Sequence, residues 1–266
     1  MEKLESAPKK ERDIEQDRTA FFEAMKSFVV KEIDAEFDDQ SVESLVSELD
    51  ESKLFLLGEM HGARENVDVI YSLFKKFGFK KLALEWDKIL QGQVDEFLKT
   101  GKIDFESMQS SCDGRITAGH FALINKLKEE GLLEAVVCFD EEPLTGEWDG
   151  RDMNMAKNIL ESLSDSSTLV VAGNLHTKTE PFAFRGEEVK HHPMGENVKK
   201  QIENVPAGRI EYAKGQYHNI GIKDFRRDPD EPELAKAKFY KSADGIYSFD
   251  LPEAHAAVVP NPSERE

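Results

Sequence analysis

The chain lacks three features that would each define a class of protein. No apolar run comes near the roughly 18 residues of a membrane-spanning helix. The first residues, MEKLESAPKKERDIEQDR, contain no apolar segment of the kind that a secretory signal carries. We therefore expect a cytoplasmic protein with neither a membrane span nor a leader.

Cysteine and basic residues are scarce as well. The 266 residues include two cysteines, Cys112 and Cys138, without a CxxC pair, so neither a disulfide framework nor a zinc ribbon is expected. Cys138 lies in the apolar run AVVCF and is expected to be an inert core thiol. Lysine and arginine number 35 against 53 aspartates and glutamates, a net charge of -18. This balance disfavours nucleic-acid binding, which depends on clustered basic residues.

Four short apolar runs, separated by helical patterns, organise the chain. None of the runs alternates polar with apolar residues, and this is typical of strands buried on both faces of a parallel sheet. The order strand, helix, strand, helix predicts an α/β fold, a single domain with a mainly parallel central sheet flanked by helices. The four runs are Leu54–Gly58, Lys81–Glu85, Ala135–Phe139 and Thr168–Gly173.

The C-terminal part has a different pattern. A helix is expected over 194–202, followed by additional short antiparallel strands at an edge of the sheet. An N-terminal helical pattern runs from 14 to 33. Residues 1–13 and 258–266 are expected to be tails, which leaves 14–257 as the domain. The expected short strands lie within 208–222, 238–240 and 246–249.

Polar side chains follow the predicted strands where a parallel sheet binds its ligands, beyond the carboxyl ends. Glu59 and His61 follow the first run, Glu85 ends the second, Asp140 follows the third and His176 follows the fourth. Both histidines stand in Gly-x-x-His sequences, in which the glycine is expected to let the backbone turn sharply. If these strands are neighbours, two imidazoles and two or three carboxylates converge.

Two further residues are candidates at this edge. Arg151 is predicted to open a helix, where a cation opposes the helix dipole, so it is expected either to be compensated by Asp152 or to serve an acid or a developing oxyanion. His120 lies four residues after Ile116 on an apolar stripe. This spacing is typical of a core histidine, with a wall of a ligand pocket as the alternative.

The convergent residues suit two kinds of chemistry. Glu59, His61, Glu85 and His176 would supply the ligands of zinc, manganese or cobalt, although no HExxH spacing fixes the ligand set. Without a metal, His61 would be the general base that deprotonates water, with the two glutamates orienting it. Arg151 would stabilise charge on a carbonyl oxygen.

These motifs resemble a known superfamily. GEMHG, ALEW, RDMNMAKNI and AGNLH occur here in the order seen in the erythromycin esterase, ChaN-like and Tiki superfamily. The resemblance runs from Leu54 to His176, and more faintly through 215–222. It implies either ester hydrolysis by activated water, metal-dependent proteolysis, or haem binding. On the matching positions it implies an active-site set, which is Glu59, His61, Glu85, Arg151 and His176.

The first hypothesis is therefore a hydrolase that attacks an ester or amide carbonyl with water, acting on a small molecule or a peptide. The alternative is a non-catalytic protein that binds haem or another small ligand, with iron held by His61, His120 or His176. A catalytically dead relative ranks last, because five polar groups aimed at one crevice cost stability unless something uses them.

Overall fold

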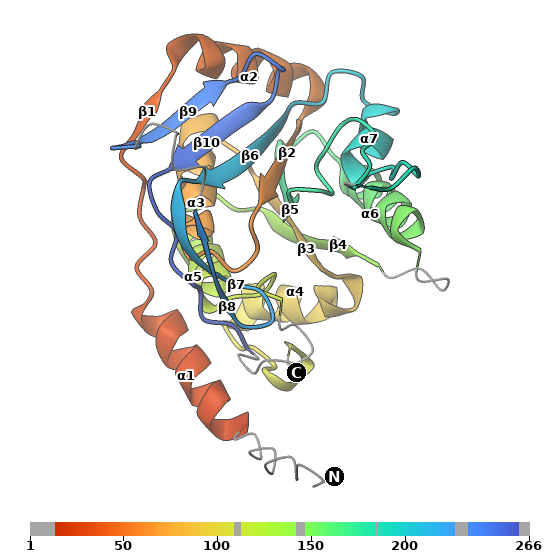
Figure 1. The fold of residues 1–266 in the computed structure, drawn as a ribbon. Helices are drawn as coiled ribbons and strands as arrows, with labels where there is room; N and C mark the ends of the chain where they lie inside the picture. Colours follow the sequence, from red (N-terminus) through yellow and green to blue (C-terminus); the bar gives the residue numbers. More distant parts are fainter. Residues whose placement is uncertain (1–13, 109–112, 142–146, 185, 227–233, 261–266) are drawn as a thin grey trace, which may run out of the picture.

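The computed structural model describes residues 14–108, 113–141, 147–184, 186–226 and 234–260. Its centre is an eight-stranded sheet of order β1-β9-β10-β6-β2-β5-β3-β4, and β7 and β8 form a second sheet (Figure 1). The strands are β1 (Ala35–Phe37), β2 (Leu54–Glu59), β3 (Lys81–Asp87), β4 (Ala135–Asp140), β5 (Thr168–Gly173), β6 (Ala207–Tyr212), β7 (Lys214–His218), β8 (Ile222–Arg226), β9 (Ala237–Lys241) and β10 (Tyr247–Leu251). The helices are α1 (Ile14–Ser27), α2 (Asp39–Ser52), α3 (Asn66–Phe77), α4 (Gln91–Thr100), α5 (Ala118–Glu129), α6 (Trp148–Ser162) and α7 (Met194–Lys199), with 3-10 turns at Lys88–Leu90 and Glu106–Met108.

The four apolar runs of the sequence form the strands β2 to β5. β2 pairs with β5, β5 with β3, and β3 with β4, all in parallel. The predicted α/β fold with a mainly parallel sheet is confirmed. β5 lies between β2 and β3, so the sequence that follows β5 emerges between the other two strand ends.

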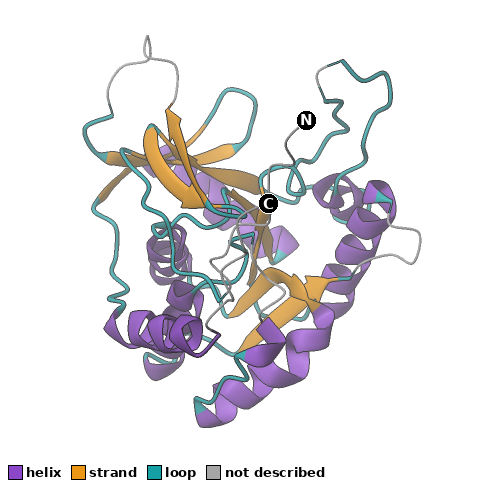
Figure 2. Ribbon diagram, turned by 60° about the horizontal axis from the view of Figure 1, so that its bottom comes forward, coloured by secondary structure: helices purple, strands orange, loops and turns teal. Residues whose placement is uncertain are grey.

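Helices cover both faces of this sheet (Figure 2). Alternate side chains of β2 enter two cores: Phe55 and Leu57 pack with α3 and α5, whereas Leu54 and Leu56 pack with α6 and α7. This explains why the runs are continuously apolar, because both faces of each strand are buried. In the described part of the chain, no helix combines the length and the apolar character needed to cross a membrane.

The C-terminal strands differ in part from the expectation. β6 is parallel to β2 and lies inside the sheet, and β10 is parallel to β6 but antiparallel to β9. β7 and β8 are an antiparallel pair outside the main sheet. The short mixed patterns of polar and apolar residues in these strands are compatible with several positions in a sheet. The pattern alone therefore did not predict where each strand lies.

Helix boundaries also differ from the predicted ones. α1 ends at Ser27 although the apolar pattern runs on to 33, and α7 ends at Lys199 rather than at 202. The helices α2 and α4 were not predicted. Residues 1–13 and 261–266 of the predicted tails, together with Cys112, lie outside the described residues. Cys138 is buried, and burial raises the pKa of its thiol to about 12.

Candidate functional site

The carboxyl ends of β2, β3 and β5 bring the predicted residues together. His61, in the loop after β2, has Nε2 3.5 Å from Oε2 of Glu85 at the end of β3. His176, after β5, has Nε2 3.6 Å from Oε1 of the same carboxylate. Arg151, from α6, donates from Nη2 to Glu85 Oε1 at 2.9 Å. Glu85 is therefore the common neighbour of both histidines and the arginine.

His61 lies between two buried carboxylates. Its Nδ1 is 3.1 Å from Oε1 of Glu59, while its Nε2 faces Glu85. Both glutamates are 4% exposed and His61 is 19% exposed at the side chain. A neutral imidazole carries one N–H, so two carboxylates can both accept a hydrogen bond only from the imidazolium. This geometry favours the charged form of His61.

The pKa shifts agree with that charge state. Burial lowers the pKa of His61, but Glu85 and Glu59 raise it by more, to about 10. Burial raises the pKa of Glu85, yet His61, His176 and Arg115 together hold it well below its usual value. Burial also raises the pKa of Glu59, which His61 opposes. At neutral pH the site therefore pairs a protonated His61 with an ionised Glu85.

Glycine is required at the strand ends for close approach rather than for turning. The sequence predicted a sharp backbone turn at Gly58 and Gly173, but both lie inside regular strands and neither has a positive φ. A Cβ on Gly173 would lie 3.0 Å from Nε2 of His61. The backbone N–H of Gly173 also donates to Oε2 of Glu85 at 2.7 Å. The end of β5 can lie against both His61 and Glu85 because this residue has no side chain.

Two guanidinium groups neutralise the carboxylates. Arg151 Nε donates to Asp140 Oδ1 at 2.9 Å and its Nη2 donates to Asp140 Oδ2 at 2.7 Å. Arg115, in the loop before α5, donates from Nη1 to Asp140 Oδ2 at 2.6 Å. Arg151 does not open its helix as predicted, since α6 begins at Trp148. It serves acids across the crevice, Glu85 and Asp140, one of the two roles that the sequence allowed.

His176 has a different setting from His61. Its Nδ1 is 2.5 Å from Oδ1 of Asp152, which is completely buried, and Nη1 of Arg151 lies 3.5 Å from its Nε2. The indole of Trp148 stacks on the imidazole, with centroids 4.8 Å apart and planes 15° apart. One ring nitrogen thus faces a carboxylate, and the other faces Arg151 and Glu85.

Asp152, Trp148 and Arg115 were not predicted from the sequence as residues of the site. A signal for Asp152 was present, because it lies four residues before Ala156 on the buried stripe of α6. A charged residue on an apolar stripe needs a partner. Trp148 and Arg115 carried no comparable signal, because their partners come from distant parts of the chain.

His120 lies in the first turn of α5, away from the charged cluster. It is 2% exposed, and its Nδ1 is 3.0 Å from the hydroxyl of Thr117, the N-cap of α5. Its ring packs edge-on against Trp86, with centroids 5.8 Å apart. Burial and, to a smaller extent, the charge of His61 lower the pKa of His120 to about 3. The structure places it as a core histidine.

The donor set does not fit a divalent cation. Glu85 accepts from Arg151 on Oε1 and from Gly173 on Oε2, and both nitrogens of His61 face carboxylates. Two guanidinium groups lie beside the acids, where they would repel a cation. Within the described ranges, no three or more His, Cys, Asp or Glu residues are grouped so as to hold a metal. The metal role predicted for Glu59, His61, Glu85 and His176 has no support in this geometry.

Haem does not fit these residues either. An iron ligand is a neutral imidazole nitrogen that faces an open apolar slot. His61 faces carboxylates, His120 is enclosed in the core, and His176 is covered by Trp148 on one face and by Asp152 at one edge. The arrangement therefore offers no ready haem ligand among the three histidines that the sequence proposed.

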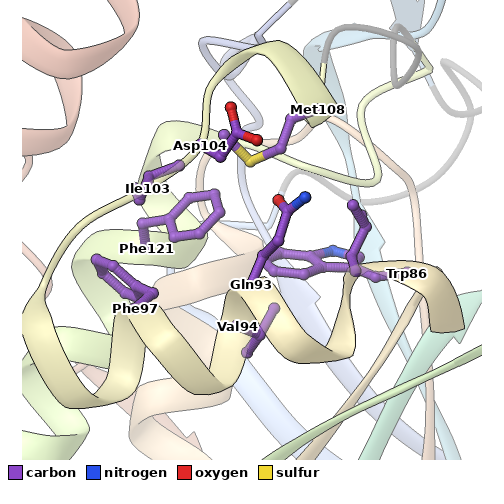
Figure 3. Close-up of a pocket in the computed structure, with 9 residues that line it drawn as sticks. Trp86, Gln93, Val94, Phe97, Ile103, Asp104, Met108 and Phe121 are labelled. Atoms are coloured by element: carbon purple, nitrogen blue, oxygen red, sulfur yellow. The ribbon is translucent and has the colours of Figure 1, made fainter.

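An apolar pocket lies beside the charged cluster but does not contain it. Figure 3 shows the Trp86 indole along one side of the pocket, with Phe97, Phe121 and Met108 around it. Trp86 follows Glu85 on β3 and so points to the opposite face of the strand. Its Nε1 donates to the carbonyl oxygen of Arg115 at 2.8 Å. Trp86 thus links the wall of this pocket to the loop that carries Arg115.

Gly62, the last residue of GEMHG, fixes the loop that carries His61. Its φ is +73°, and a Cβ there would lie 2.1 Å from the carbonyl oxygen of His218 at the end of β7. Its N–H donates to the carbonyl of Gly114 at 3.0 Å, and its own carbonyl accepts from His218 N at 3.1 Å. These contacts hold together the loop after β2, the hairpin of β7 and β8, and the segment that carries Arg115.

Gly62→Ala should destabilise the fold far more than Gly78→Ala. Gly78 has nearly the same φ, +69°, but a Cβ there would meet nothing within 4 Å. We expect the Gly78 change to cost about 1 kcal/mol and the Gly62 change about 3 kcal/mol or more, because only the second forces backbone to move. Urea unfolding of both variants measures the difference. Equal losses would show that the contact with His218 does not constrain the loop.

Comparison with known proteins places the fold. No family model matches the sequence, and no curated protein does. The structure is similar to a mutant of the erythromycin esterase EreC in its open conformation, with a TM-score of 0.61 and 13% identity over 83% of this chain and 95% of that one. It is also similar to a succinoglycan biosynthesis protein, with a TM-score of 0.59 and 11% identity over 81% of this chain and 91% of that one. A protein from Bacillus cereus has a TM-score of 0.56 and 9% identity over 94% of this chain and all of that one, 100%. The chain therefore has the fold of erythromycin esterase EreC, and the resemblance indicated by its paired Gly-x-x-His motifs is confirmed at the level of the fold.

Proposed function

We propose that the protein is a hydrolase that directs water onto an ester or amide carbonyl of a small molecule or peptide. The observation that carries this proposal is the contrast between the two histidines. Both imidazoles lie against Glu85. Both ring nitrogens of His61 face carboxylates alone, whereas Nε2 of His176 faces the guanidinium of Arg151 as well as Glu85. Such a pair supplies one group that holds a proton and one that can accept it.

His176 is assigned as the general base. A carboxylate at Nδ1 accepts the ring N–H, which leaves the lone pair on Nε2. Nε2 lies 3.5 Å from Nη1 of Arg151 and 3.6 Å from Oε1 of Glu85, so a cationic donor stands beside it and offsets the carboxylate. A water between Nε2 and the substrate carbonyl would lose its proton to this nitrogen as its oxygen attacks the carbon.

His61 is assigned as the general acid, which revises the expectation that it is the base. Its position between Glu59 and Glu85 favours the imidazolium, and with a pKa of about 10 it holds its proton at neutral pH. When the tetrahedral intermediate collapses, the bond to the leaving group breaks and that group takes the His61 proton. The proton on His176 returns to His61 through solvent, which restores the resting state.

Arg151 stabilises the oxyanion in this scheme. Its Nη2 and Nε are held by Glu85 and Asp140, which fixes the guanidinium with Nη1 on the His176 side. A fixed donor close to the base stabilises negative charge as it develops on the carbonyl oxygen, and loss of such a donor costs about 3 kcal/mol. The shared fold with a protein named as an esterase supports the reaction class and leaves the substrate open.

The proposal is tested by hydrolysis of a panel of activated esters, lactones and peptides. Wild type and His61→Ala are assayed side by side, each with EDTA and with added manganese, cobalt or zinc. We expect turnover in the wild type that EDTA leaves unchanged and that is about 10²- to 10⁴-fold lower in the variant. Equal turnover by both proteins would contradict the placement of His61 in the active site. Turnover only with added metal would contradict the assignment of the histidines as acid and base. No turnover together with a Soret band on adding haemin would favour the binding alternative.

A further inference from the structure

The first turn and a half of α6 surrounds His176 from two directions. Trp148 and Asp152 are four residues apart in α6, so they project from the same face of the helix. Trp148 covers a face of the imidazole, and Asp152 contacts its Nδ1 edge. The ring is therefore fixed in both tilt and rotation by a single helix.

Among the described residues, the buried carboxylate of Asp152 has one hydrogen-bonding side chain beside it, His176. The residue is 0% exposed, and among the described residues its Oδ2 has no hydrogen-bond partner. A buried carboxylate costs stability unless it is paired, and here the contact with His176 is the one at hydrogen-bond distance. A purely structural role would be served better by an apolar residue on this stripe, between α6 and the sheet.

The stack of Trp148 on His176 has a second consequence. An indole face attracts a cation that lies over it, so the imidazolium that forms when Nε2 takes a proton is stabilised where it stands. Trp148 is also contacted edge-on by Phe184, with centroids 6.1 Å apart, which holds the indole in place. Trp148 thus orients the imidazole of His176 and also stabilises its protonated form.

We propose that Asp152 and Trp148 are positioning residues that act through His176: Asp152 sets the proton on Nδ1, and Trp148 holds the ring so that Nε2 faces Arg151 and Glu85. This inference rests on the proposed function for its effect on turnover. The contact itself has a readout that does not depend on turnover, which is the tautomer of His176.

The tautomer is read by 15N NMR of histidine-labelled protein, in wild type, Asp152→Asn and Asp152→Ala. We expect the wild-type proton on Nδ1 and a shift of that proton to Nε2 in both variants. Met153→Ala is the matched control, because Met153 is the next residue on α6 and is 60% exposed. Its tautomer and kcat should match those of the wild type.

Turnover gives the second readout. Asp152→Asn should lower kcat by about 10²- to 10⁴-fold with little change in KM, since the lone pair is lost from Nε2. Trp148→Ala should lower kcat by about 2- to 10-fold, and Trp148→Phe should restore most of it because a phenyl ring can still stack. Retention of the Nδ1 proton and of kcat in both Asp152 variants would overturn the proposal. If the tautomer shifts in the Asp152 variants but neither they nor the wild type turn over any substrate, the contact between Asp152 and His176 is upheld and the proposed reaction is contradicted.

Discussion

Replacing His176 with glutamine is expected to lower kcat for ester hydrolysis by about 10²- to 10⁴-fold, the range that a positioned base contributes. Glutamine keeps a polar side chain beside Asp152 but has no nitrogen that accepts a proton at neutral pH. KM should change little, because the base acts on water rather than on the bound substrate. Steady-state kinetics on the best substrate of the panel measures both parameters.

His192→Gln is the matched control for this change. His192 is 48% exposed at its side chain, and its Nδ1 is 2.8 Å from Glu196. It repeats the pairing of a histidine with a carboxylate, but on the surface. We expect its kcat to equal that of the wild type. A His176→Gln variant with wild-type turnover would assign the base elsewhere, with His61 as the next candidate.

Replacing Arg151 with methionine is expected to cost about 3–5 kcal/mol of the free energy of unfolding. The change removes the guanidinium from two buried carboxylates, Glu85 and Asp140, which are 4% and 5% exposed. Breaking a buried pair by removing one partner leaves an uncompensated charge, and this is the origin of the large cost. Arg115 still contacts Asp140 Oδ2 at 2.6 Å, so the lower end of the range is expected.

Arg18→Met serves as the control for the loss of an arginine. Arg18 forms an exposed pair with Glu15 at 3.7 Å, and pairs of that kind contribute at most about 1 kcal/mol.

Urea unfolding of Arg151→Met at pH 7 and pH 4 separates two causes of lost stability, the uncompensated buried charge and the lost packing of the side chain. The folded-state pKa of Glu85 lies well below its usual value, so the stability from its ionisation is complete above the usual pKa and is lost as pH falls towards the lowered one. In the variant, the carboxylates left without Arg151 are relieved of their charge by protonation at low pH. The Arg151→Met deficit should therefore shrink at low pH, and a deficit that is equal at both pH values would point to lost packing instead.

Much of the fold could be predicted because the relevant signals are local. The four runs that became β2 to β5 are buried on both faces, so their continuous apolar pattern is unambiguous over each strand. The strand order was not predictable in this way. The place of β5 between β2 and β3, and of β6 beside β2, depends on pairing between residues far apart in the chain.

The site was predictable to the same extent. Glu59 and Glu85 lie near the carboxyl ends of their strands and the two histidines lie just beyond them. Parallel strands bring these ends to one edge of the sheet, so the convergence of the four residues followed from the pattern. The charge state of His61 did not follow, because it depends on which carboxylates face each ring nitrogen.

The partners of these residues were harder to foresee. Asp152 and Trp148 flank His176 only because α6 lies against the loop after β5, and Arg115 contacts Asp140 from a loop that is distant from it along the chain. A single sequence reports which residues share a strand or a helix face, whereas such contacts are set by tertiary packing.

The pH dependence of kcat/KM for an amide substrate between pH 6 and pH 10.5 tests the central claim most directly, with His61→Gln run alongside. If His61 is the acid and His176 the base, wild-type kcat/KM stays level from pH 7 to above pH 9 and falls as pH passes His61's pKa of about 10. The variant should have a lower rate without that fall. A wild-type rate that instead rises about tenfold per pH unit from pH 7 towards pH 10 would show that His61 must lose its proton to act, which would make it the base and contradict the assignment of the two histidines.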